Sequence, residues 1–162
     1  MPIKVGDRLP TTTFRVMTPE GPKPRTTDDI FKGKKTVLFA VPGAFTPTCH
    51  RNHLPGFIQH ADAIKGRGVD QIAVTSVNDP FVMAAWQNDT DADGKIDLFL
   101  ADGNAEFAQA TGLDSDDSER GRGIRSQRYS MIVEDGVVKS LNIEETAGKA
   151  EISGADNLLK QL

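Results

Sequence analysis

The sequence predicts an α/β sandwich in which helices flank a central mixed β-sheet. The first observation is a strand, helix, strand pattern between residues 35 and 77, which is typical of parallel neighbouring strands. The second is the continued alternation of helical and strand patterns over residues 80–112. The third is a β-hairpin pattern over residues 128–143, which adds antiparallel strands. Together they favour a mixed sheet between helical layers.

The first two expected strands are β-branched and aromatic runs. KTVLFAV (residues 35–41) and QIAVTSV (residues 71–77) both read as buried strands. Between them, apolar residues recur at the i, i+3, i+4, i+7 spacing of a helix that faces a core. These residues are Leu54, Phe57, Ile58, Ala61 and Ile64.

The alternation continues with shorter segments. PFVMAAWQ (residues 80–87) predicts a helix, with Pro80 suited to its first turn. IDLFLAD (residues 96–102) predicts a strand, and AEFAQATG (residues 105–112) predicts a short helix that Gly112 ends.

The strongest hairpin signal lies in the carboxyl-terminal third. Residues 128–134 and 137–143 read as strands, joined by the turn-forming pair Asp135-Gly136. GADNLLKQL (residues 154–162) predicts a closing helix.

Composition limits the classes of protein. The 162 residues, 38% of them hydrophobic and 26% charged, suit one globular domain spanning residues 1–162. A net charge of −4 disfavours nucleic acid as a partner. No run approaches the roughly 18 apolar residues of a membrane helix, and MPIKVGDRLP has no signal-peptide core, so we expect a cytoplasmic protein without a membrane partner.

The lone cysteine stands in VPGAFTPTCH, residues 41–50. If a helix begins here, Thr46 is the N-cap, Pro47 takes the first helical position and Cys49 takes the third. Unpaired amides and the helix dipole then stabilise Cys49 as a thiolate, which makes it reactive. The alternative is a buried cysteine that acts as a small hydrophobic residue.

Pro42-x-x-x-Thr46-x-x-Cys49 resembles the active-site motif of peroxiredoxins, the thiol peroxidases. The likeness extends to three blocks, VPGAFTPTCHRNHLPGF, GVDQIAVTSVNDPFVMAAW and RSQRYSMIVEDGVVKSLNIEE, which look like the type-5 branch. This resemblance implies a thioredoxin-like fold, reduction of hydrogen peroxide and organic hydroperoxides, and a homodimer. We expect no cofactor and no metal.

The resemblance also implies residue roles. Cys49 would be the peroxidatic cysteine, whose thiolate attacks a peroxide oxygen and becomes a sulfenic acid. Thr46 would link peroxide to the backbone, Pro42 would shield the thiolate from water, and Arg128 would favour the thiolate and hold the peroxide.

Three further residues receive weaker assignments. Arg125 either reaches the same site or serves the surface. His53, one turn beyond Cys49, either orients groups in the site or packs on the helix for structure. We expect His53 and Thr48 to contribute to substrate binding.

One cysteine allows no intramolecular disulfide. Similar chains carry a resolving cysteine in the regions corresponding to residues 147–153 or 71–77, and this chain has none in either. We therefore expect a one-cysteine cycle resolved by an external thiol, either glutathione with glutaredoxin or thioredoxin.

Three other motifs suggest different functions, and each lacks a required feature. Asp89 to Asp97 match the first half of a calcium-binding EF-hand loop, but Leu100 stands where a bidentate Glu is needed. Cys49, His53 and His60 share a helix face but are too few for a structural metal. The basic stretch 120–128 lacks the interleaved aromatics of an RNA contact and reads as the loop that delivers Arg128.

Two function classes remain open. The first is a peroxidase that acts through Cys49, and the second is a noncatalytic redox sensor of the same fold. A Cys-His hydrolase is a weaker candidate, because no third orienting residue is apparent.

Overall fold

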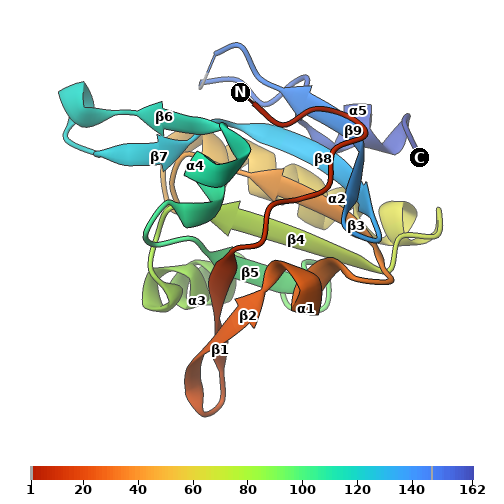
Figure 1. The fold of residues 1–162 in the computed structure, drawn as a ribbon, viewed down its shortest axis with the longest axis horizontal. Coiled ribbons are helices and arrows are strands. Elements are labelled where there is room, and N and C mark those ends of the chain that lie inside the picture. Colours follow the sequence, from red (N-terminus) through yellow and green to blue (C-terminus); the bar gives the residue numbers. More distant parts are fainter. Residues whose placement is uncertain (1, 147) are drawn as a thin grey trace.

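The computed structural model describes residues 2–146 and 148–162, so Ala147, the first residue of the segment 147–153 considered above, lies outside the described residues. Within this part of the chain, seven strands form one sheet in the order β2-β1-β5-β4-β3-β8-β9 (Figure 1). The strands are β1 (Thr13–Thr18), β2 (Gly21–Thr26), β3 (Lys35–Ala40), β4 (Gln71–Ser76), β5 (Leu98–Ala101), β8 (Tyr129–Glu134) and β9 (Val137–Ile143). A second sheet pairs β6 (Asp114–Asp116) with β7 (Ile124–Ser126).

The large sheet is mixed, as the sequence predicts. β3 and β4 are parallel, as are β4 and β5, whereas β8 is antiparallel to both β3 and β9. Every residue of β4 is buried, which explains its continuous apolar and small-residue pattern.

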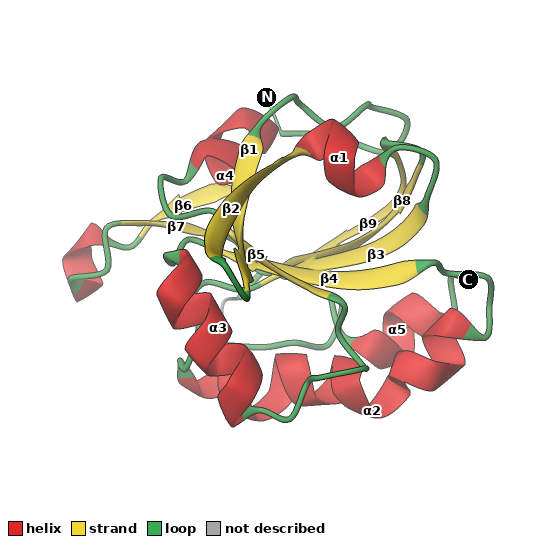
Figure 2. Cartoon of the chain, turned by 90° about the horizontal axis from the view of Figure 1, so that it is seen from below, coloured by secondary structure: helices red, strands yellow, loops and turns green. Residues whose placement is uncertain are grey.

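Helices cover both faces of the sheet (Figure 2). The helices α2 (Leu54–Lys65), α3 (Pro80–Asp89) and α5 (Ala155–Leu159) lie on one face, and α1 (Thr27–Phe31) and α4 (Glu106–Thr111) lie on the other. Successive side chains of β3 therefore enter different cores, with Val37 and Phe39 on the α2 side and Leu38 and Ala40 on the opposite side.

The expected hairpin turn and the expected helix end both have the backbone conformations that their residues favour. Asp135 and Gly136, which join β8 to β9, both have positive φ, 50° and 79°, the conformation of a type I′ hairpin turn. Gly112 ends α4 in the left-handed conformation with φ 73°. In α3, Pro80 occupies the first turn and the Asp79 side chain accepts from the Val82 amide.

Several elements differ from the sequence-based expectation. The interpretation of residues 120–128 as a loop is wrong in part, because Ile124–Ser126 form β7. The hairpin β1–β2, the helix α1 and the short 3-10 helix η2 (Ser118–Arg120) were not predicted at all. Within the described ranges, every helix is too short or too polar to cross a lipid bilayer.

Candidate active site

Cys49 lies at the start of a helix that follows the carboxyl end of β3. Pro47 is the first helical residue, so Cys49 takes the third position, as predicted. The segment Cys49–His53 (η1) is π-helical rather than α-helical, with the Leu54 amide donating to the Cys49 carbonyl, and it continues into α2. Such single π turns occur mostly inside α-helices and often at functional sites. The Cys49 side chain is fully buried.

Thr46 stands at the predicted N-cap position but bonds differently from an N-cap. Its Oγ1 donates to the carbonyl of Gly43 at 2.6 Å, and the Gly43 carbonyl also accepts from the Thr46 amide at 3.4 Å. The hydroxyl therefore closes the turn before the helix. Pro42, which begins this turn, is buried.

Arg128 reaches Cys49 from the opposite strand. Tyr129 pairs with Ala40 at the ends of β8 and β3, so Arg128 lies beside the point where the chain leaves β3 toward the turn. Its Nη2 donates to Cys49 Sγ at 3.1 Å, and the side chain is only 3% exposed. A guanidinium is permanently charged, so it places a fixed positive charge against the sulfur.

His53 holds the other edge of the same guanidinium. Arg128 Nη1 lies 3.1 Å from His53 Nδ1, and His53 Nε2 lies 3.0 Å from the carbonyl of Ser153. Because Arg128 can only donate, Nδ1 must accept and the proton must sit on Nε2, which donates to Ser153. Burial and the Arg128 charge lower the pKa of His53 to about 3, so the ring is neutral.

Aromatic rings enclose His53, the last residue of η1. The His53 ring lies 5.1 Å from the Phe39 ring and 5.5 Å from the Phe57 ring, centroid to centroid. Those two phenylalanines stack on each other at 4.1 Å. The histidine is therefore both packed in the core and hydrogen-bonded in the site, so the two interpretations of it are compatible.

Thr48 and Arg125 lie at the edges of this group. Thr48 Oγ1 donates to the Gly148 carbonyl at 3.2 Å, so its hydroxyl joins the helix start to the carboxyl-terminal segment. Arg125 donates from Nη1 to the Val77 carbonyl at 2.9 Å. A Cβ added at Gly43 would lie 3.6 Å from that Nη1, so Arg125 packs beside the turn that precedes Cys49.

Three residues of the site were missed by the sequence analysis. Asn78 Oδ1 accepts from the Ala44 amide at 3.0 Å and so anchors the turn before Cys49. Ser153 offers its backbone carbonyl to His53, and Glu144 Oε1 accepts from the Ser153 amide at 2.8 Å. The Asn-Asp-Pro sequence at 78–80 signals a turn but not this contact, and no pattern marks Ser153 or Glu144.

A small hollow opens next to the guanidinium. It has a volume of about 210 Å³, and Pro42, Arg128 and Glu144 are among its lining residues. A small polar molecule in this hollow would lie beside the Arg128 side chain.

Asp97 and His60, which belong to the two possible metal motifs, make other contacts. Asp97 accepts from the Ile72 amide at 2.8 Å and from Lys65 at 3.0 Å, and His60 pairs with Asp156 at 2.9 Å. Among the residues that the structure describes, no group of three or more His, Cys, Asp or Glu side chains is placed to hold a metal ion.

The arrangement suits attack by sulfur on an electrophile. A thiolate at a helix start next to a fixed cation is a nucleophile, and the same cation can stabilise negative charge on a departing atom. The neutral His53, with its Nδ1 lone pair on Arg128, is not available as a proton acceptor from Cys49.

The fold and this site together define a thioredoxin-like protein with a reactive cysteine, and the family model described as Redoxin matches residues 4–159. "Peroxiredoxin-2E, chloroplastic" from Arabidopsis thaliana is 46% identical over 164 residues, which cover 99% of this chain and 69% of that protein. The crystal structure of reduced Prx3 from Vibrio vulnificus in complex with H2O2 has a TM-score of 0.92 and 49% identity, covering 98% of each chain. Peroxiredoxin 5 from Alvinella pompejana has a TM-score of 0.83 and 39% identity, covering 99% of each chain. The chain belongs to the peroxiredoxin family of thiol peroxidases.

Proposed function

We propose that this peroxiredoxin reduces hydrogen peroxide and organic hydroperoxides through Cys49, and that it is of the type-5 branch in a one-cysteine form. The observation that carries the proposal is the hydrogen bond of 3.1 Å from Arg128 Nη2 to the buried Cys49 Sγ. The similarity to the Vibrio vulnificus Prx3 complex with H2O2 supports the choice of substrate, and the similarity to Peroxiredoxin 5 supports the branch.

In the proposed first step, the Cys49 thiolate attacks one peroxide oxygen, and the O–O bond breaks. Sulfur is oxidised to the sulfenic acid, and the departing oxygen takes up a proton and leaves as water or an alcohol. Arg128 stabilises the charge that moves from sulfur to the departing oxygen. The Thr46 hydroxyl, 2.6 Å from the Gly43 carbonyl, is the group that we assign to orienting the peroxide.

In the proposed second half of the cycle, an external thiol attacks the sulfenic acid, which gives a mixed disulfide and water. A second thiol then attacks that disulfide, which returns Cys49 to the thiol and releases an oxidised disulfide. Cys49 is the only cysteine of the chain, which supports this scheme. We propose glutathione with glutaredoxin as the reductant, with thioredoxin as the alternative.

We further propose a homodimer that works in the cytoplasm. Two large aromatic side chains, Phe45 and Phe81, are 46% and 66% exposed. The Phe45 ring lies 6.5 Å from the ring of Trp86 on α3, the helix that also carries Phe81. Exposed aromatic side chains of this kind support self-association. A cycle that depends on external thiols suits a reducing compartment.

Multiple turnover separates the peroxidase from a noncatalytic sensor. We expect hydrogen peroxide consumption to continue over many equivalents when the protein is supplied with glutathione, glutaredoxin, glutathione reductase and NADPH. Sustained turnover with thioredoxin, thioredoxin reductase and NADPH, but not with the glutathione system, would contradict the proposed reductant. Consumption that stops at one equivalent with both systems would favour the sensor.

A further inference from the structure

The carboxyl-terminal hairpin presents two side chains at one end of the sheet. Tyr129 pairs with Ile143, so the next residues outward, Arg128 and Glu144, lie opposite each other. The Glu144 amide donates to the Arg128 carbonyl at 2.9 Å, which ties the two backbones together. Arg128 turns toward Cys49, whereas Glu144 turns toward the segment that precedes α5.

Glu144 fixes this segment through Ser153. The carboxylate Oε1 accepts from the Ser153 amide at 2.8 Å and from the Ser153 hydroxyl at 3.1 Å. Ser153 is fully buried and Glu144 is 8% exposed. Without the carboxylate, two buried donors of Ser153 would lose their acceptor, which is costly enough to move the segment.

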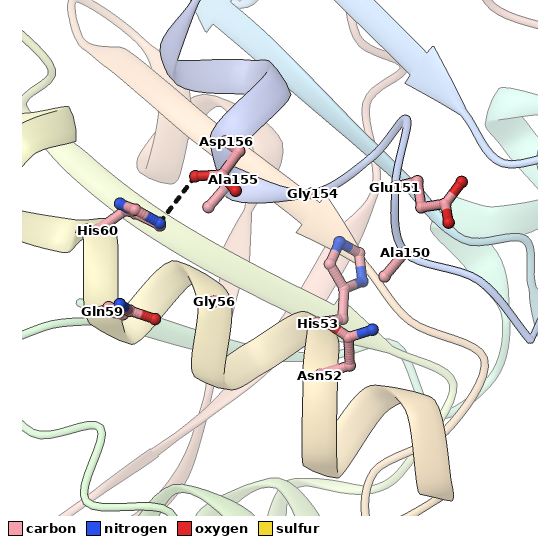
Figure 3. A pocket seen from close by; sticks show the side chains of 10 residues that line it. All are labelled: Asn52, His53, Gly56, Gln59, His60, Ala150, Glu151, Gly154, Ala155 and Asp156. Atoms are coloured by element: carbon pink, nitrogen blue, oxygen red, sulfur yellow. Dashed lines mark ion pairs between the residues drawn. The ribbon is translucent and has the colours of Figure 1, made fainter.

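The Ser153 carbonyl in turn selects the tautomer of His53. Figure 3 shows His53, at the end of η1, pointing toward the segment that carries Glu151 and Gly154. It lies on the wall of a pocket whose other end holds the His60–Asp156 ion pair. The carbonyl accepts only from Nε2–H, so Nδ1 is left as an acceptor for Arg128. In the other tautomer an Nδ1–H would face the Arg128 N–H, and the two donors would repel each other.

Arg128 is thereby oriented by a chain of buried contacts. Its Nη1 meets His53 and its Nη2 meets Cys49, each at 3.1 Å, so the planar guanidinium has little freedom to turn away from sulfur. We propose that Glu144 is a positioning residue, which acts through Ser153 and His53 to hold Arg128 against Cys49. This inference rests on the proposed function of Cys49 and Arg128.

The test compares Glu144→Ala with Glu144→Gln. The amide of Gln keeps an oxygen that can accept from Ser153, whereas Ala removes the acceptor. We expect Glu144→Ala to slow the single-turnover oxidation of Cys49 by hydrogen peroxide about tenfold, and Glu144→Gln to stay within about threefold of the parent protein. The pH profile of Cys49 alkylation by iodoacetamide should move to higher pH in Glu144→Ala alone.

Glu145→Ala is the matched control, because Glu145 is exposed and its loss removes the same charge from the next position. It should leave the rate and the pH profile unchanged. Equal losses in Glu144→Ala, Glu144→Gln and Glu145→Ala would overturn the proposal, because they would indicate an effect of charge alone. A parent-like rate and profile in Glu144→Ala would overturn it as well.

The tautomer of His53 gives a readout that needs neither peroxide nor turnover. Imidazole ¹⁵N shifts of the parent protein should show the Nε2–H form, and Glu144→Ala should show a mixture of tautomers. An Nδ1–H form in the parent, or an unchanged Nε2–H form in a folded Glu144→Ala, would refute the proposal that Glu144 acts through Ser153 and His53. A failure of the proposed function would instead appear as slow peroxide oxidation in the parent protein itself, with its tautomer as expected.

Discussion

The guanidinium of Arg128 donates to both Cys49 and His53, and the protonation of His53 decides whether both hydrogen bonds can form. A protonated His53 would have no lone pair for Arg128 and would place two positive charges 3.1 Å apart in a buried site. The neutral ring is therefore part of what keeps Arg128 on Cys49.

The depressed pKa of His53 makes folding depend on pH. Its pKa is about 3 in the folded protein and 6.5 in the reference state, so the unfolded chain binds one more proton between those values. The stability that the neutral ring contributes is present above pH 6.5 and is lost as the pH falls toward 3. The free energy of unfolding should decrease from pH 7 to 5, with a slope from this group of at most about 1.4 kcal/mol per pH unit.

Urea unfolding at pH 7, 6 and 5 measures this slope. We expect His53→Gln to flatten it, since Gln can accept from Arg128 and donate to Ser153 without titrating. His60→Gln, which changes a half-buried histidine on the same helix, is the control and should keep the parent slope. The same slope in all three proteins would exclude His53 as its source.

The Thr46 hydroxyl should matter to chemistry more than to folding. Thr46→Val preserves the shape of the side chain and removes the donor to Gly43, so we expect Cys49 oxidation to slow by about tenfold or more. Thr46→Ser keeps the hydroxyl and should remain within a few-fold of the parent. Rapid-quench oxidation followed by intact mass measures both rates, and equal rates for Val and Ser would show that the hydroxyl has no such role.

At the scale of the element, the π-helical turn Cys49–His53 poses a problem of access. The Cys49 side chain has no exposed surface in the folded protein, so an external thiol can reach its sulfur only if this turn opens. An external thiol must nevertheless reach the sulfenic acid in the proposed cycle. A π turn is a less regular arrangement than an α-helix, so we expect local opening to begin there.

Hydrogen exchange tests this opening. In the mixed disulfide of Cys49 with glutathione, amides of residues 46–54 should exchange faster than in the reduced protein, because the bulky adduct does not fit the buried position. Amides of β4, which is buried along its whole length, should be unchanged and serve as the internal control. Equal protection of residues 46–54 in both states would contradict the proposed opening.

The elements also show what a sequence pattern can and cannot predict. The strands β3 and β4 were predicted because buried parallel strands are continuous apolar runs. The strand β2 was missed because it contains Pro22 and Pro24, which argue against a central strand. It is an edge strand, and the two prolines, two residues apart, place their missing N–H groups on the same side, the side without a partner.

The same limit applies to the site. Cys49, Thr46 and Pro42 could be singled out because a short motif contains all three. Ser153 could not, because it acts through a backbone carbonyl, a group that nearly every residue has, and it meets His53 across 100 positions of sequence. Asn78 likewise depends on the pairing of β3 with β4, since it meets the Ala44 amide across 34 positions. Glu144 meets Ser153 across only nine positions, but no short motif contains both residues.

At the scale of the whole molecule, the sheet assembles the site from three segments. Cys49 and Arg128 are 79 positions apart, and the pairing of β3 with β8 brings them together. The segment before α5 adds the Ser153 carbonyl, which holds His53. This segment leads into α5, which packs against α2 (Figure 2). The reactive pair is thus a product of strand order rather than of local sequence.

The proposed homodimer makes a prediction at this scale. Phe81→Glu places a charge on the exposed aromatic face of α3, and we expect it to shift sedimentation toward the monomer. Val5→Glu changes another exposed apolar residue, 57% accessible, outside this face and should leave the dimer intact. Identical sedimentation of both variants and the parent protein would argue against this face as the interface.

The most direct test of the account is the rate at which one equivalent of hydrogen peroxide oxidises Cys49. It is followed by intact mass with a sulfenic-acid trap, in the parent protein and in Arg128→Met, which removes the hydrogen bond to Sγ and keeps an unbranched side chain. We predict fast oxidation in the parent and a loss of about a hundredfold or more in the variant. A parent rate no faster than that of a free thiol, or an Arg128→Met rate equal to the parent's, would contradict the central claim that Arg128 activates Cys49.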